Sequence, residues 1–317
     1  MQQFSLGTTG LSVSAYSLGC LNFGSRTDKE TSFRLLDRYA EAGGNFLDTA
    51  NNYAFWNEGC FGGESESLLG EWIRVRKNRS GIIVATKVGA KPTVPGGGFD
   101  QIEGLSGKAI EKAIDESLLR LGTDYVDLLY AHIDDTNTPL EETLETFDRL
   151  IKAGKVRALG CSNYPFSRLL EAKEISTTKG LASYSCIQQR YTYLQPRINA
   201  DFGIQVSADD NLLAYCKEND DFTMLAFSPL LGGLYSREDA SIPDGYRSEE
   251  QLSRLQAIRK VARELGATPN QVVLAWMLQN VPKVLPLVAV SDLAQLEENL
   301  GALHIQLDAE LLEHLNR

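Results

Sequence analysis

Short apolar runs alternate with longer segments of mixed polarity along most of the chain. The longer segments have helical spacing, as in Phe33, Leu36 and Tyr39, where apolar residues recur every third position. Repeated alternation of strand-like and helix-like segments is typical of a parallel sheet whose strands are connected by helices. The apolar runs that we expect to form strands centre on residues 15–19, 46–48, 82–87, 126–132, 156–162, 186–190, 223–227 and 284–290.

Turn and cap residues mark the ends of several elements. Before the first run, Phe4 and Leu6 alternate with polar residues and a TTG turn follows, which predicts a short β-hairpin. Thr268 followed by Pro269 is a typical helix start, and Gly266 is a typical helix end. Local signals therefore agree with the boundaries that the periodicity suggests.

Eight strand–helix units in a chain of 317 residues fit one closed (β/α)8 barrel of the TIM type, preceded by the hairpin. We therefore expect residues 1–317 to form a single domain. An open doubly wound sheet is the alternative, but it should place a GxGxxG turn after its first strand, and residues 18–24 supply none. Long irregular segments follow the ends of expected strands and should crowd the carboxyl-end face of the barrel, at residues 53–63, 89–107, 194–207 and 232–247.

Composition narrows the choice of partners and compartment. The formal net charge of −11 argues against nucleic acid or an anionic membrane surface as the main partner. No apolar run approaches the roughly 20 residues that span a bilayer, and the N-terminus does not resemble a signal peptide. The five cysteines include no CxxC pair, and the three histidines have no zinc-site spacing. We expect a cytoplasmic protein with reduced thiols and no bound metal.

Four polar residues of different chemistry fall at or just after the ends of predicted strands. Asp48 and Tyr53 follow one strand, Lys87 ends the next, and His132 ends a third. Each residue alone has a structural explanation: a helix cap, a loop phenol, a lysine that reaches solvent, or a structural histidine. In a barrel, however, all carboxyl strand ends meet at one mouth, so the four residues should gather there as a proton-donating site.

Three stretches resemble the aldo-keto reductase superfamily. They are GGNFLDTANNY with the following ESLLGEWI, LGTDYVDLLYAH, and GKVRALGCSNY. The resemblance implies an NAD(P)H-dependent oxidoreductase that reduces an aldehyde or ketone to an alcohol, or catalyses the reverse. It also implies that Asp48, Tyr53, Lys87 and His132 form the catalytic set. Tyr53 is then the proton donor, Lys87 is expected to lower the pKa of Tyr53, Asp48 to fix Lys87, and His132 to orient the substrate oxygen.

The stretch LAFSPLLGG, from residue 225 to 233, suits a phosphate site, because backbone N–H groups at its glycines can approach a pyrophosphate closely. The resemblance implies that Phe227 stacks on the nicotinamide and that Gln188, chosen over Gln189 by its spacing to Tyr191, bonds to the carboxamide. The full cofactor set that we expect is Cys20, Leu21, Asp48, Ser162, Asn163, Gln188, Phe227, Ser228, Leu230, Gly232, Ser291, Gln295, Glu298 and Asn299.

NADP is the expected cofactor, with NAD as the alternative. Ser291 stands where many superfamily members have an arginine for the 2′-phosphate; its hydroxyl can still bond to that phosphate, and a cation from elsewhere could supply the missing charge. Arg237, Lys260 and Arg247 are the candidates.

The substrate-binding residues that we expect are Tyr53, Trp56 and His132. Phe55, Cys60 and Phe61 lie in the same loop as Trp56, which suits either a sugar-like substrate or a small apolar carbonyl. The alternative function is a nucleotide-binding regulatory subunit resembling the potassium-channel β subunits. The sequence leaves the oligomeric state open.

Overall fold

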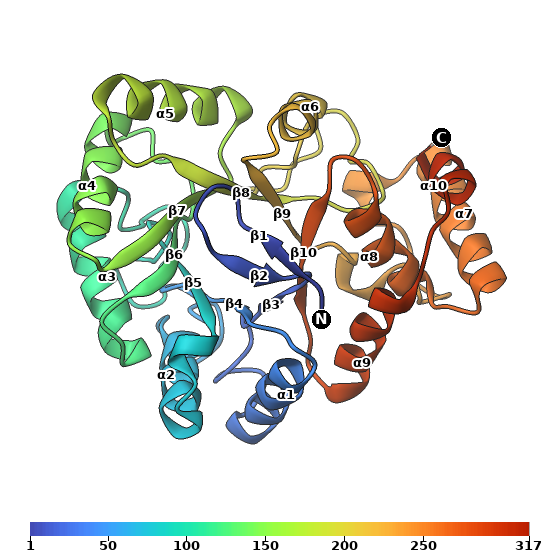
Figure 1. Cartoon of the computed structure of the whole chain (residues 1–317), viewed down its shortest axis with the longest axis horizontal. Helices are drawn as coiled ribbons and strands as arrows, with labels where there is room; N and C mark the ends of the chain where they lie inside the picture. Colours follow the sequence, from blue (N-terminus) through green and yellow to red (C-terminus); the bar gives the residue numbers. More distant parts are fainter. Residues whose placement is uncertain (317) are drawn as a thin grey trace.

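The computed structural model describes residues 1–316 and contains a closed barrel of eight parallel strands. Successive strands pair along the ring, and β10 closes it by pairing with both β9 and β3. Figure 1 shows the strands as a ring with the helices around its outside. The predicted (β/α)8 barrel is confirmed. Its strands are β3 (Ser17–Gly19), β4 (Phe46–Asp48), β5 (Ile83–Val88), β6 (Val126–Ala131), β7 (Val156–Ser162), β8 (Tyr184–Arg190), β9 (Thr223–Phe227) and β10 (Val284–Ala289).

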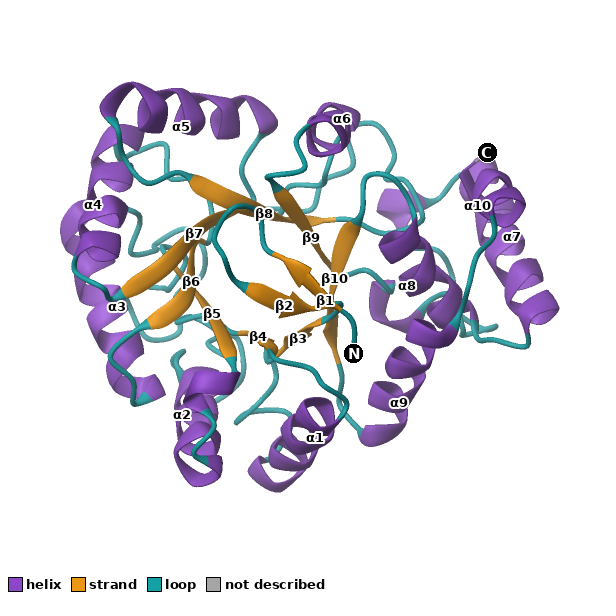
Figure 2. Cartoon of the chain, viewed as in Figure 1, coloured by secondary structure: helices purple, strands orange, loops and turns teal. Residues whose placement is uncertain are grey.

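Ten α-helices lie within residues 1–316, and most of them cover the outer face of the barrel (Figure 2). Helix α7 is additional to the repeating pattern, since it precedes α8 within one connection and packs against α8 and α10. The helices are α1 (Lys29–Glu41), α2 (Glu64–Arg76), α3 (Gly107–Leu121), α4 (Leu140–Lys152), α5 (Phe166–Lys179), α6 (Asp210–Glu218), α7 (Glu249–Leu265), α8 (Pro269–Gln279), α9 (Leu293–Gly301) and α10 (Ala309–Asn316).

The helix ends follow the local signals. The Thr268 hydroxyl caps α8 and forms a reciprocal capping box with Gln271, while Pro269 occupies the first turn. Gly266 ends α7 with a φ of 63°, a left-handed conformation that glycine adopts without a side-chain clash. None of the helices in residues 1–316 combines the length and apolar character needed to cross a bilayer.

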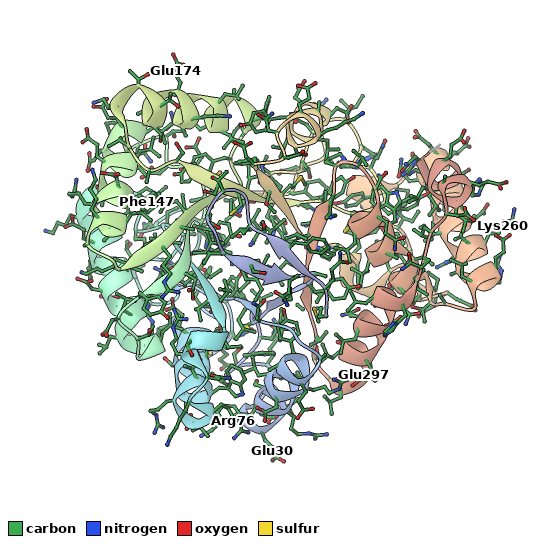
Figure 3. The ribbon with its side chains drawn as sticks, viewed as in Figure 1. Glu30, Arg76, Phe147, Glu174, Lys260 and Glu297 are labelled. Atoms are coloured by element: carbon green, nitrogen blue, oxygen red, sulfur yellow. The ribbon has the colours of Figure 1, made fainter. Side chains whose placement is uncertain are left out.

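Apolar side chains divide into a barrel interior and an outer layer under the helices. Phe147 of α4 is fully buried in the outer layer, whereas Glu174 and Lys260 are exposed on the outer surface (Figure 3). Inside the barrel, Phe46 and Leu128 belong to a second cluster of buried side chains. The helices therefore present one apolar face to the barrel and a charged face to solvent.

The N-terminal hairpin closes one end of the barrel. Its strands are β1 (Gln3–Ser5) and β2 (Ser12–Ser14), which lie across the middle of the strand ring in Figure 1. Leu6 and Val13 are fully buried in the barrel-interior cluster. Because this end is plugged, access to the interior is expected from the opposite end, where the strands finish at their carboxyl ends.

Two strand boundaries differ from the prediction for identifiable reasons. The first barrel strand begins at Ser17 instead of residue 15, because the Tyr16 carbonyl accepts bonds from Ser14 Oγ (2.9 Å) and Tyr39 OH (2.5 Å). These side-chain donors replace the neighbouring strand. The sixth strand extends back to Tyr184, two residues before the predicted start at 186, through pairing with β7 at Leu159.

Candidate active site

A cavity of about 740 Å³ lies among residues that follow the carboxyl ends of the barrel strands. At one end of its lining stand Tyr53 and His132, and a second group comes from the segment after β10, including Ser291 and Gln295. A cavity of this size with apolar walls and a few convergent polar groups is typical of a site for a small molecule or a cofactor.

Lys87 is fully buried and connects Asp48 with Tyr53. Its Nζ donates to Asp48 Oδ1, to the Thr49 carbonyl (2.9 Å) and to the Tyr53 hydroxyl oxygen (2.7 Å). Asp48 and Lys87 lie on the neighbouring strands β4 and β5. Tyr53 follows β4 in a short turn, in which its backbone N–H donates to the Ala50 carbonyl (3.3 Å). The three side chains therefore meet because their strands are adjacent, with Asp48 paired to Ala85 two residues before Lys87.

Asp48 is held from two further sides. Its Oδ2 accepts from Gln188 Nε2 at 2.8 Å, and its Oδ1 accepts from the Tyr53 hydroxyl at 3.3 Å. A buried carboxylate needs several donors to offset its lost hydration, and Lys87, Gln188 and Tyr53 provide them. Asp48 is therefore a fixed anion that orients the groups around it.

The pKa of Tyr53 moves in the opposite direction from our prediction. Burial raises the pKa of the phenol well above its ordinary value, and the Asp48 carboxylate raises it further. Burial likewise lowers the pKa of Lys87, against the opposing attraction of Asp48. The expected net lowering of the Tyr53 pKa is therefore wrong for this resting site, because burial and Asp48 outweigh the effect of the nearby Lys87 ammonium. Tyr53 is a neutral phenol with a proton to donate.

His132 follows β6 and lines the cavity beside Tyr53. Its backbone N–H donates to the Val88 carbonyl (2.9 Å), and its ring centroid lies 6.0 Å from that of Tyr53. Burial, and then the Lys87 ammonium, hold the pKa of His132 well below its usual range. The imidazole is therefore neutral, and its Nδ1 has no hydrogen-bond partner within residues 1–316.

Ser162, Asn163 and Gln188 line the cavity next to His132. Asn163 Nδ2 donates to the His132 carbonyl (3.0 Å) and to Ser162 Oγ (3.1 Å). Gln188 faces the cavity while Gln189 does not, as expected from the alternation of side chains along a strand. Of the two glutamines, Gln188 is thus the one on the cavity wall, and its bond to a cofactor carboxamide stays a prediction.

The opposite wall is built by the turn after β9. Ser228 and Leu231 have φ values of 55° and 48°, a left-handed conformation that costs energy in residues other than glycine. Gly232 and Gly233 continue the turn with φ values of 67° and 82°, and an added Cβ at either would meet no atom within 4 Å. Backbone N–H groups in such a turn form a concave surface suited to an anion.

The far end of the cavity lies against α8 and α9. Glu298 accepts from the Thr268 hydroxyl (2.7 Å) and from Asn270 Nδ2 (3.3 Å), and Ser236 Oγ lies 3.4 Å away. The side-chain oxygen of Gln295 accepts from the Ser291 N–H at 2.8 Å. These polar groups leave the buried Asn270 Oδ1 without a partner in the described part of the chain.

Of the three cations proposed for this end, only Arg237 lines the cavity in the described structure. Arg247 pairs with Asp244 (3.0 Å), and Lys260 lies 3.8 Å from Glu264 on the same helix. Arg237 is exposed and follows Ser236, which contacts Glu298. The proposal that Lys260 or Arg247 supplies charge to the cavity is therefore wrong.

Large apolar side chains from three loops surround the entrance. Trp56, Phe99 and Ile204 line the cavity, yet they are 40%, 39% and 39% exposed. Phe55 packs edge-on against both Trp56 and Phe99, with ring centroids 5.1 Å apart in each case. The Tyr53 ring lies 6.2 Å from Trp56, so aromatic contacts run from the entrance to the proton donor.

The loop after β5 is anchored by one carboxylate. Glu103 Oε1 accepts from Asn51 Nδ2 and from the Gly89 N–H, both at 2.7 Å. Burial raises the pKa of Glu103. This contact holds the loop that carries Phe99 against the segment that carries Tyr53.

Two expected cofactor residues do not line the cavity. Asp48 lies behind Tyr53, and the Cys20 thiol is buried and points to the Leu18 carbonyl (3.4 Å). The other residues expected to bind cofactor or substrate are on the cavity wall: Leu21, Tyr53, Trp56, His132, Ser162, Asn163, Gln188, Phe227, Ser228, Leu230, Gly232, Ser291, Gln295, Glu298 and Asn299.

Sequence reasoning missed several wall residues, including Asn52, Phe99, Ile204, Gln205 and Asn270. Most lie on long loops, where periodicity carries no information about direction. Asn270 lies in the first turn of α8, and its position after Thr268-Pro269 is the one signal that could have indicated it. Residues 1–316 contain no group of three or more His, Cys, Asp or Glu side chains arranged to hold a metal ion.

Comparison with known proteins shows similarity in sequence and in fold. The sequence model of the Aldo/keto reductase family matches residues 16–317. The uncharacterized oxidoreductase YrpG of Bacillus subtilis is 32% identical over 324 residues, which cover 100% of this chain and 95% of that protein. The norsolorinic acid reductase stcV of Emericella nidulans is 31% identical over 96% of this chain and 78% of its own length.

Two further similarities extend this picture. The NADP(+) aryl-alcohol dehydrogenase of Phanerodontia chrysosporium is 30% identical over 97% of this chain and 83% of its own length. The crystal structure of a thermostable aldo-keto reductase, Tm1743, with the inhibitor epalrestat matches with a TM-score of 0.77 and 27% identity. That match covers 100% of this chain and 99% of the other.

Proposed function

The chain belongs to the aldo/keto reductase family, and we propose that residues 1–317 form one catalytic domain that reduces an aldehyde or ketone with NADPH. In this proposal Tyr53 is the proton donor, and the reverse oxidation of an alcohol uses the same groups. The observation that carries the proposal is the position of the Tyr53 phenol, which lines the cavity with Lys87 Nζ 2.7 Å from its oxygen.

The chain's own groups supply the proton chemistry. Reduction of a carbonyl develops negative charge on its oxygen, so a proton must reach that atom. Burial keeps Tyr53 protonated until then, and the Lys87 ammonium stabilises the phenolate that remains after the transfer. Asp48 fixes Lys87, and the neutral His132 is able to donate one hydrogen bond to the substrate oxygen. Such general acid catalysis typically contributes about 10²–10⁴-fold in rate.

The wall residues fit a dinucleotide cofactor, which when bound supplies the hydride for reduction and accepts it in the reverse reaction. We assign Ser162, Asn163 and Gln188, which line the cavity together with Phe227, to the cofactor carboxamide. The left-handed turn from Ser228 to Gly233 presents backbone donors suited to a pyrophosphate. Ser291, Gln295, Glu298 and Asn299 form the polar end that we assign to adenosine. The unpaired Asn270 Oδ1 at that end supports the assignment, since it is a buried acceptor facing an otherwise satisfied cluster.

We infer a preference for NADP over NAD from Arg237. It lines the cavity, is adjacent to the Ser236–Glu298 contact and forms no ion pair within residues 1–316. A guanidinium binds a phosphate through charge-assisted bonds that are roughly twice as strong as neutral ones. The name of one relative, an NADP(+) aryl-alcohol dehydrogenase, supports the same choice.

We infer that the substrate carries an aromatic or other apolar body in preference to a sugar. Trp56, Phe99 and Ile204 present partly exposed apolar surface at the entrance, and a ligand that covers it gains about 25 cal/mol per Å² of buried area. Aromatic rings in this cluster already meet edge-on, an arrangement that suits a further ring. One relative is named an aryl-alcohol dehydrogenase, which agrees with this inference.

The test is a turnover assay with purified protein, NADPH or NADH, and matched aromatic aldehydes, aliphatic aldehydes and aldose sugars. We expect NADPH consumption with aromatic aldehydes, with kcat/KM at least about tenfold above that for any aldose, a difference of about 1.4 kcal/mol. Tight NADPH binding without turnover of any carbonyl would support the regulatory-subunit alternative. A higher kcat/KM for sugars would overturn the substrate class alone.

A further inference from the structure

Gln189 on β8 is buried, with 1% of its surface exposed, and does not line the cavity. Its amide pairs with the backbone of the turn after β7. The side-chain oxygen accepts from the Asn163 N–H at 2.8 Å, and the side-chain nitrogen donates to the Tyr164 carbonyl at 2.6 Å. A reversed amide would face donor with donor and acceptor with acceptor, so the partners fix its orientation.

The turn that Gln189 contacts is conformationally strained. Asn163 has a φ of 57°, in the left-handed region that residues other than glycine rarely adopt. Such a residue persists only where its surroundings hold it, and the two bonds from Gln189 act directly on this turn. The N–H of Asn163 lies 3.4 Å from the Gln188 carbonyl, so the ladder bond there is long and the side chain of Gln189 gives the shorter contact.

In this conformation the Asn163 side chain connects three strand ends. Its Nδ2 donates to the His132 carbonyl (3.0 Å) after β6, and its Oδ1 accepts from the Val206 N–H (3.1 Å) in the loop after β8. Gln189 therefore contacts a residue of the cavity wall, Asn163, without lining the cavity itself. Asn163 in turn joins His132 to the loop after β8.

We propose that Gln189 is a positioning residue, which holds Asn163 in its left-handed conformation so that the Asn163 amide and His132 keep their places at the nicotinamide end of the cavity. This inference rests on the proposed function and extends it to a residue that contacts neither cofactor nor substrate. Substitution of Gln189 should therefore change cofactor affinity and kcat, and it should leave the apolar entrance around Trp56 and Phe99 unchanged.

The chain offers a matched control. Gln279 at the end of α8 makes the same kind of paired contact with backbone, since its nitrogen donates to the Ile305 carbonyl (2.8 Å) and its oxygen accepts from the Leu307 N–H (2.9 Å). Gln279 does not line the cavity. Substitution of either glutamine by methionine removes two hydrogen bonds and keeps the side-chain length, so the two variants differ in which backbone they release.

We expect Gln189→Met to raise the NADPH dissociation constant about tenfold and to lower kcat, because both bonds that hold the turn at Asn163 and Tyr164 are lost. Binding is measured by quenching of tryptophan fluorescence, and kcat and KM with a compact aromatic aldehyde. Gln279→Met should lower the urea midpoint comparably and leave NADPH affinity and kcat within about twofold of the unmodified protein. Equal effects of both variants on NADPH affinity would overturn the proposal.

Two further variants test the route of the effect. In an Asn163→Gly background the loss of affinity caused by Gln189→Met should largely vanish, because residues that act through one another are not additive. Full additivity would overturn the positioning role. Gln189→Glu should lose less affinity than Gln189→Met, since burial favours its neutral acid, which offers an acceptor and a donor. A greater loss for Gln189→Glu would contradict the two-bond geometry. If the unmodified protein binds NADPH but reduces no carbonyl, the proposed function fails, while the binding data still decide the role of Gln189.

Discussion

The substitution Lys87→Met should destabilise the fold and abolish catalysis, and its partner substitution should restore only stability. Lys87 and Asp48 are both fully buried and paired, with no solvent to take over either charge. Methionine has nearly the length of lysine and fits the same space, so the change removes the ammonium with little change in volume.

The magnitude follows from what remains. Asp48 keeps donors from Gln188 (2.8 Å) and Tyr53 (3.3 Å), but it loses its only cation among residues 1–316, and the Thr49 carbonyl loses its donor. Removing one partner of a buried pair typically costs about 3–5 kcal/mol, because the other charge is left uncompensated. Adding Asp48→Asn removes that charge at almost constant shape, so the double variant should regain at least about 2 kcal/mol.

The assay is urea denaturation of the unmodified protein, both single variants and the double variant, followed by tryptophan fluorescence and far-UV circular dichroism. Coincident transitions permit a two-state free energy of unfolding. The double variant should be more stable than Lys87→Met and equally inactive. A Lys87→Met variant with unchanged stability, or a double variant less stable than the sum of the singles predicts, would refute the reasoning about this buried pair.

Three further predictions follow from the same geometry. His132→Gln should flatten the pH dependence of stability. Burial and then Lys87 hold the pKa of His132 low, so between pH 7 and pH 5 only the unfolded chain takes up a proton at this residue. The free energy of unfolding of the unmodified protein should therefore fall by about 2 kcal/mol over that range. Urea midpoints across that range check it, and an equally steep loss in the variant would contradict it. Arg237→Met should raise the NADPH dissociation constant about tenfold at low salt and leave NADH within about twofold, with Arg247→Met as the control; equal losses for both cofactors would show that Arg237 does not meet the 2′-phosphate. Glu103→Gln should become more stable relative to the unmodified protein as the pH rises from 4 to 8. Burial raises the pKa of Glu103, so the Glu103 carboxyl stabilises the fold below the unfolded pKa of about 4.3, and this contribution is lost as the pH rises through the folded pKa. Urea midpoints of the two proteins that fall in parallel with rising pH would contradict this prediction.

The sequence was sufficient for the barrel and for the gathering of the four polar residues. Strand periodicity locates Asp48 and Lys87 on neighbouring strands, and parallel topology then requires their ends to meet. The spacing to Tyr191 that the family resemblance supplies favours Gln188 over Gln189, and the alternation of side chains along β8 agrees with it. These predictions depend on regular elements, where position in the chain determines direction in space.

Other features depend on the packed structure. Phe99 and Ile204 reach the cavity from long loops, whose course is set by contacts such as that of Glu103 with Asn51. The raised pKa of Tyr53 results from burial and then from the Asp48 carboxylate, and the spacing of residues does not reveal how deeply the phenol is buried. The sequence gives no signal that distinguishes Gln189 from other strand residues, because its proposed role depends on the conformation of the turn after β7.

Tyr53→Phe tests the central claim most directly, since it removes one hydroxyl and keeps the ring in place. The measurement pairs the NADPH dissociation constant with kcat for a compact aromatic aldehyde, on the variant and the unmodified protein. If Tyr53 donates the proton, NADPH affinity should stay within about twofold and kcat should fall by at least about 10². Near-normal reduction by Tyr53→Phe, with NADPH still bound, would contradict the assignment of Tyr53 as the proton donor.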